Sequence, residues 1–125
     1  PEAVKSLFQE ASVCEAAGAL RAAGVLYRAV VEELVKDQGG TGKDLFHQID
    51  SLQGRLEEDL LEDLHESRVI GNESVHHGVT FETEEIGDLA SALQEACRVL
   101  YEVPAQRQRY RAQRAARVQA RKGKR

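Results

Sequence analysis

An arginine, an asparagine and a histidine recur at every fourth position in one stretch of the chain, as Arg68, Asn72 and His76. On an α-helix, which has about 3.6 residues per turn, this spacing places the three side chains in one stripe. A guanidinium binds phosphate through paired hydrogen bonds, and an imidazole exchanges a proton near neutral pH. The residue types therefore suit the binding and cleavage of a phosphodiester, and we expect the three groups to face a shared opening that can receive an anion.

Three interpretations of this stripe are open. The three side chains could satisfy one another in a hydrogen-bond network that fixes the end of a helix, because buried polar groups need partners. They could bind RNA or another phosphate-containing ligand without chemistry. They could also form a metal-independent ribonuclease, in which His76 is the general acid or base and Arg68 stabilises the phosphate. Glu32 and Glu33 either add a carboxylate to this polar centre or form a solvated helix face.

The stripe lies on the fourth of five predicted amphipathic helices. Apolar residues repeat at intervals of three and four over residues 2–17, 19–37, 43–52, 55–77 and 83–103. Gly78 is expected to end the fourth helix, Thr83 to be the N-cap of the fifth, and Pro104 to interrupt or end the fifth. We predict an all-α fold, a four- to five-helix up-and-down bundle with short connections.

The charges divide the chain into an acidic body and a basic tail. Residues 104–125 contain nine Lys/Arg and no Asp/Glu, whereas residues 1–103 contain eight Lys/Arg and all 21 Asp/Glu. We predict a bundle over residues 1–103 and a basic helical arm over residues 104–125. The arm is expected to contact RNA or DNA phosphates, to link the bundle to a further domain, or to neutralise the acidic body. Its predicted nucleic-acid-binding residues are Arg107, Arg109, Arg111, Arg114, Arg117, Arg121 and Lys122.

Composition excludes several classes of protein. A chain of 125 residues is expected to form one domain with its own hydrophobic core. The sequence contains no apolar run of about 20 residues, so we expect no membrane span and a cytoplasmic location. Cys14 and Cys97 fall at positions of the helical pattern that can face inward, and we expect buried free thiols in a reducing compartment. Two cysteines are also too few for a structural zinc site. We predict no metal and no cofactor.

Three segments resemble a known family in the same order along the chain. Residues 22–32 are rich in Ala, Arg and Glu, residues 45–52 follow the pattern Leu-x-x-x-Ile-x-x-Leu, and residues 68–76 follow Arg-x-x-Gly-Asn-x-x-x-His. These segments resemble the HEPN superfamily, and more closely the domain-of-unknown-function family numbered 4145. The resemblance covers roughly residues 1–103.

This resemblance implies a helical bundle that forms a homodimer, with two polar stripes facing one another across a cleft. It also implies a place in a prokaryotic defence or restriction-type system, as part of a larger protein or complex. In active HEPN proteins, residues such as Arg68 and His76 are credited with RNA cleavage that needs no metal. Many relatives serve instead as pairing or nucleic-acid-sensing modules, so binding, catalysis and a purely structural dimerisation domain all remain open.

Overall fold

Every named secondary-structure element in the part of the chain that the structure describes is a helix, which confirms the predicted all-α class. The computed structural model describes residues 1–76 and 81–124. Five helices form a bundle and a further helix follows them. The elements are α1 (Glu2–Ala16), α2 (Leu20–Asp37), α3 (Leu45–Asp50), α4 (Glu58–His76), α5 (Thr83–Cys97), a π-helical turn (Arg98–Glu102) and α6 (Val103–Gly123).

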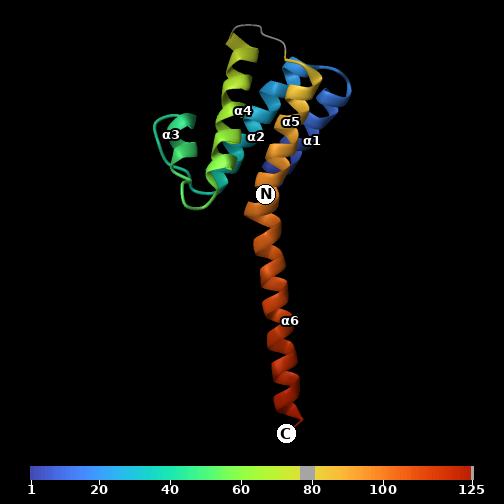
Figure 1. Ribbon diagram of the computed structural model, residues 1–125. Helices are drawn as coiled ribbons and strands as arrows, with labels where there is room; N and C mark the ends of the chain where they lie inside the picture. The colour runs from blue at the N-terminus through green and yellow to red at the C-terminus, as the bar shows by residue number, and fades with distance from the viewer. Residues whose placement is uncertain (77–80, 125) are drawn as a thin grey trace. The chain divides into compact units, whose positions relative to one another are not determined.

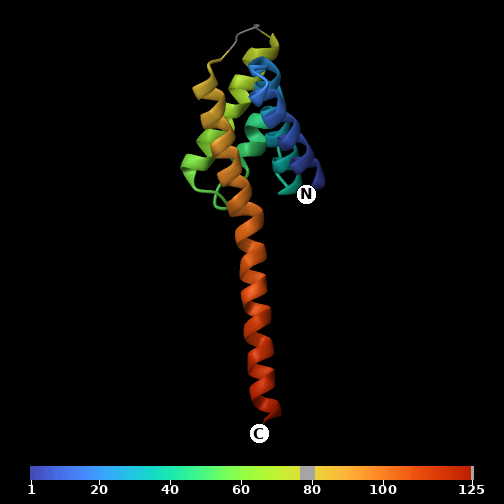
Figure 2. The same cartoon turned by 90° about the vertical axis from the view of Figure 1, so that its right-hand side faces the viewer.

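The chain separates into two compact units, Pro1–Gln94 and Glu95–Arg125, and the division falls within α5. In the first unit α1, α2, α4 and most of α5 lie side by side, and the short α3 lies beside α4 (Figure 1). The second view shows the same grouping of the four longer helices (Figure 2). The second unit consists of the end of α5, the π-helical turn and the single continuous helix α6.

Helix α2 supplies much of the core of the first unit. Its fully buried residues follow the predicted apolar face. Gly18, with φ of 80°, makes the turn that brings α1 back against α2, a conformation that glycine adopts at little cost. The Tyr27 hydroxyl donates a 2.6 Å hydrogen bond to the Glu15 carboxylate, and the Phe8 ring packs edge-on against the Tyr27 ring. Burial, together with Glu15, raises the pKa of Tyr27 to about 12.

Small residues let α2 and α4 approach one another closely. A Cβ at Gly24 would lie 3.1 Å from Ser74 Oγ and 3.7 Å from Cδ1 of Ile86, at the start of α5. A Cβ at Gly71 would lie 2.4 Å from the Cβ of Arg28. Gly24 is thus paired with Ser74, and Arg28 with Gly71, so the two helices run antiparallel. This arrangement fixes which side of α4 remains open to solvent.

The short helix α3 begins and ends inside its predicted range. Asp44 is its N-cap, because its carboxylate accepts a 2.9 Å hydrogen bond from the His47 N–H. Leu45 and Ile49 point into the core, as the apolar pattern predicts. α4 begins at Glu58, later than predicted, and so has two acids in its first turn. The expected end of α4 near Gly78 lies outside the described residues.

Two predicted boundaries of the later helices were wrong. Thr83 is the first residue of α5 and not its N-cap, and the Glu85 carboxylate accepts a 3.1 Å hydrogen bond from the Glu82 N–H ahead of it. Pro104 neither ends nor interrupts the helical path. The π-helical turn directly before α6 changes the hydrogen-bond spacing, and Pro104 occupies the first turn of α6, where its missing N–H is not needed.

The two cysteines are free thiols, as predicted, but they are half-buried and not fully enclosed. Among the described helices, none is both long enough and apolar enough to cross a bilayer. The longest helix, α6, is instead dominated by Arg, Gln and Ala.

Candidate functional site

Helix α4 carries the predicted stripe, and its three members have different surroundings. Arg68 and Asn72 are half-buried, whereas His76 is exposed and is the last described residue of α4. His76 is eight positions after Arg68, which corresponds to about 12 Å along the helix axis. Within residues 1–76 and 81–124, no hydrogen bond joins any two of the three side chains. They share one side of α4, but they do not form the mutual network considered above.

Arg68 is held by an aromatic ring and not by an acid. Its guanidinium carbon lies 5.3 Å from the centre of the Phe46 ring of α3, a distance at which the positive charge is attracted to the ring. The Nε atom of Arg68 is buried and has no hydrogen-bond partner. The Phe46 ring therefore positions the Arg68 guanidinium, and the Nε–H of Arg68 can still donate to an acceptor.

Arg28 of α2 is a second arginine on this side of the bundle, and no sequence motif predicted it as a site residue. Its side chain lies directly over Gly71, since a Cβ there would be 2.4 Å from Arg28 Cβ and 2.6 Å from Arg28 Cδ. The Arg28 guanidinium forms an ion pair with Glu32, one turn later on α2. Its Nε is buried without a partner, like that of Arg68. The glycine of the signature is therefore explained by the passage of Arg28 across α4.

A histidine–carboxylate pair lies next to Arg68 and was also missed. His65 Nε2 is 2.8 Å from an oxygen of Asp50 on α3, and the His65 ring is 4.8 Å from the Phe46 ring. Both His65 and Arg68 thus contact Phe46, so α3 and α4 are joined by this small cluster. Only 20% of the His65 side chain is exposed. One sequence pattern could have indicated that His65 belongs to this cluster. His65, Arg68 and Asn72 follow the helical spacing of three and four, so they share one side of α4.

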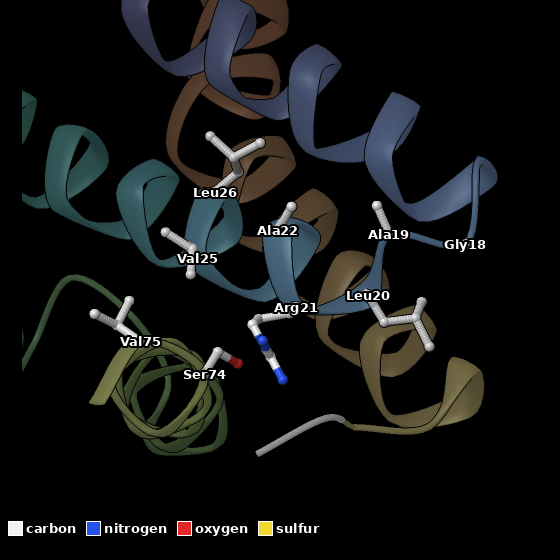
Figure 3. A pocket seen from close by; sticks show the side chains of 9 residues that line it. All are labelled: Gly18, Ala19, Leu20, Arg21, Ala22, Val25, Leu26, Ser74 and Val75. Atoms are coloured by element: carbon white, nitrogen blue, oxygen red, sulfur yellow. The ribbon is translucent and has the colours of Figure 1, made fainter. Parts of the chain in front are cut away.

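An open pocket of about 760 Å³ lies between the last described turn of α4 and the start of α2. Ser74 and Val75 of α4 form one wall, and the first two turns of α2, with Val25, form another (Figure 3). The Arg21 side chain points away from α2 toward the side of the pocket that contains Ser74 (Figure 3). Arg68, Asn72 and His76 do not line this pocket. It is mostly apolar, and Val75 at its edge is 57% exposed.

Acidic side chains gather on another part of the first unit. Asp63 and Glu66 of α4 share a small groove with Glu85 and Asp88 of α5. Burial, together with Asp59, raises the pKa of Asp63. Among residues 1–76 and 81–124, no group of three or more His, Cys, Asp and Glu side chains is arranged to hold a metal ion.

The second unit presents a basic helix. In α6 the residues from Pro104 to Gly123 are exposed, and the helix contains no acid. At about 100° per residue, Arg107, Arg111, Arg114 and Arg121 fall within an arc of about 80°. Arg109 lies on the opposite side with Ala112, Ala116 and Ala120. The predicted basic residues are thus concentrated along one face, and Arg109 is the exception among the six arginines.

Comparison with known families finds one match that covers most of the chain. A model described as a domain of unknown function, DUF4145, matches residues 9–113. The chain belongs to the DUF4145 family. The match covers α2 to α5 completely and extends into the first half of α6, beyond the range expected from sequence. Part of the basic arm of this chain, residues 104–113, therefore lies inside the matched segment. No curated protein and no solved structure matches the chain.

Proposed function

We propose that this DUF4145 chain is a nucleic-acid-associated helical module. In this proposal its HEPN-like bundle pairs with a second copy, and its basic helix α6 binds the phosphates of RNA or DNA. The observation that carries the proposal is the concentration of Arg107, Arg111, Arg114 and Arg121 on one exposed face of a helix without acids. A face of this kind attracts a polyanion without reading its sequence.

The electrostatics of the two units support phosphate as the target. The unit Pro1–Gln94 carries seven Lys/Arg and 19 Asp/Glu, so it repels nucleic acid over most of its surface. Positive charge is concentrated in α6, where Tyr110, 60% exposed, is the only aromatic side chain that can stack on a base. We therefore propose a contact dominated by phosphates with little base specificity.

Pairing of two bundles is the second part of the proposal. Val75 is exposed at the edge of a mostly apolar pocket formed by α2 and α4, a surface that a second copy would cover. The family resemblance supports the same expectation, together with a role in a prokaryotic defence or restriction-type complex. Light scattering should give the mass of a dimer at micromolar concentration; a monomer at every concentration would contradict pairing.

Binding by α6 is tested with two triple variants that remove the same charge. R107Q/R111Q/R114Q neutralises the basic face, whereas K5Q/K36Q/K43Q neutralises three exposed lysines of the first unit. A labelled oligouridylate is titrated with each full-length variant at low salt. We expect the arginine variant to lose most of its affinity and the lysine variant to resemble the parent. Equal losses in both would mean that α6 is not the binding surface.

Metal-independent RNA cleavage is the second candidate. It is favoured by the position of Arg68, whose Nε has no partner, on the same side of α4 as the exposed His76. Labelled RNA is incubated with the chain in EDTA, alongside R68A and H76A. Cleavage by the parent that both variants lose would support the enzyme. An inert parent chain would remove this candidate and leave the binding proposal unaffected.

A further inference from the structure

Arg28 and Arg68 are brought to the same part of the first unit from different helices. Arg28 crosses α4 at Gly71, and Arg68 precedes Gly71 by three residues, which is just under one helical turn. Because α2 and α4 are antiparallel, the next turn of α2 after Arg28, where Glu32 lies, is level with Arg68 on α4. Two guanidinium-bearing side chains and one carboxylate therefore share this side of the α2–α4 contact.

The hydrogen-bond donors of these two arginines are largely unused. Arg28 gives one terminal nitrogen to Glu32, and its Nε is buried without a partner. Arg68 contacts the face of the Phe46 ring, which accepts no conventional hydrogen bond, and its Nε is also buried without a partner. A guanidinium has five N–H donors, and leaving buried donors unsatisfied lowers stability. An acceptor with several oxygens would satisfy both arginines at once.

The positive charge here is unusual for the unit that contains it. Arg28 and Arg68 are two of only seven basic residues in a unit with 19 acids. Glu32, whose side chain is half exposed, is the acid paired with Arg28. Asn72 follows Gly71 directly and adds an amide on the same side of α4 as Arg68. The arrangement thus has two cations, an amide and one exposed carboxylate that can move away.

We propose that Arg28 and Arg68 form a clamp for a phosphate group and that the Glu32 carboxylate occupies Arg28 when no ligand is bound. The ligand chemistry is an oxyanion with several acceptor oxygens, which guanidinium groups bind through paired hydrogen bonds. The clamp deepens the proposed function, on which it rests for its identification of a nucleic-acid phosphate as the oxyanion. Free pyrophosphate has the same chemistry and is the second source that the experiment separates.

Competition between the Glu32 carboxylate and the ligand for Arg28 has a measurable effect on ligand affinity. A ligand oxyanion must displace the Glu32 carboxylate from Arg28 and is repelled by it. Glu32→Gln removes the competing charge but keeps the size of the side chain, so it should tighten binding by about two- to fivefold, the range expected for one half-exposed ion pair. Arg28→Gln should weaken binding, because it removes one cation of the clamp. Glu33→Gln, which neutralises the adjacent acid on α2, is the matched control.

The experiment measures the affinity of the full chain and of each variant for pyrophosphate by calorimetry and for labelled oligouridylate by anisotropy. We expect E32Q to tighten pyrophosphate binding more than E33Q does, and R28Q to weaken it while its melting temperature shows that it still folds. Equal effects of E32Q and E33Q would overturn the clamp, because they would indicate general charge repulsion. Pyrophosphate binding that no variant changes would overturn it as well.

The α6 triple variant R107Q/R111Q/R114Q distinguishes failure of the clamp from failure of the proposed function. In this background the pyrophosphate response to E32Q should persist, because the two units carry separate basic groups. If oligouridylate binding is insensitive to the α6 substitutions while E32Q still tightens pyrophosphate binding, the proposed role of α6 is wrong and the clamp stands. If E32Q tightens oligouridylate binding in the same background, the strand phosphate is supported as its ligand.

Discussion

Arg28 lies so close to Gly71 that no other amino acid fits at that position of α4 without displacing it. A Cβ would meet the Cβ of Arg28 at 2.4 Å, and that atom is fixed by the α2 backbone. The contact determines how closely α2 and α4 pack and where the Arg28 guanidinium emerges. It therefore connects a glycine in the signature segment with the placement of a cation on another helix.

Gly71→Ala should destabilise the chain by about 1–3 kcal/mol, the usual cost of inserting a methyl group into a packed contact. The chemical denaturation midpoint measures this change. Alanine is otherwise about 1 kcal/mol better than glycine inside a helix. In an R28G background, which lacks the clashing Cβ, the same substitution should therefore be neutral or stabilising. A destabilisation that is identical in both backgrounds would refute the proposed steric relationship.

The raised pKa of Tyr27 predicts that the chain loses stability at alkaline pH. Burial and the Glu15 carboxylate raise its pKa from 10.0 to about 12 in the folded chain. Between these values the unfolded chain releases the phenolic proton more readily, so the free energy of unfolding falls as pH rises. The contribution of the raised Tyr27 pKa to the free energy of unfolding is complete below pH 10 and is lost as the pH rises toward 12. Y27F, which keeps the ring, should remove this component from denaturation curves measured across that range; an unchanged pH dependence would contradict it.

The pair formed by His65 and Asp50 should contribute modestly to the docking of α3. Their side chains are 20% and 44% exposed, respectively, so solvent weakens their attraction. A double-mutant cycle with H65A and D50N should give a coupling energy of less than about 1 kcal/mol near neutral pH. Asp59→Asn, on the exposed first turn of α4, is the control and should show no coupling with H65A. Coupling of equal size for Asp59 would argue against the specific contact.

Sequence periodicity was sufficient for most of the fold. The apolar residues of α2 and α5 repeat at helical intervals, and the structure buries Val30, Leu34, Ile86 and Leu93 completely. The path through Pro104 could not be predicted, because a π-helical turn depends on hydrogen-bond spacing that composition does not specify. Apolar periodicity therefore predicted the positions of the helices, but it did not predict that a π-helical turn joins α5 to α6.

The contacts of the candidate site were harder to predict from the sequence than the helices were. The predicted stripe lies on one side of α4, but the contacts of Arg68 come from other elements. Phe46, whose ring lies beside the Arg68 guanidinium, is 22 residues away along the chain. Arg28 lies 43 residues before Gly71, the residue that it crosses. Asp50 and His65 are likewise separated by 15 residues. Such pairings depend on the packing of α2 and α3 against α4, which helical periodicity does not specify. The roles of Arg68, Asn72 and His76 in binding or catalysis remain predictions.

The most direct test of the account is the salt dependence of nucleic-acid binding. The affinity for a labelled oligouridylate is measured over a series of salt concentrations for the parent, R107Q/R111Q/R114Q and K5Q/K36Q/K43Q. Each phosphate contact on a single strand contributes about 0.7 to the slope of log affinity against log salt concentration. The arginine variant should reduce the slope by about two, and the lysine variant should leave it unchanged. A slope that all three chains share would contradict the assignment of α6 as the phosphate-binding surface.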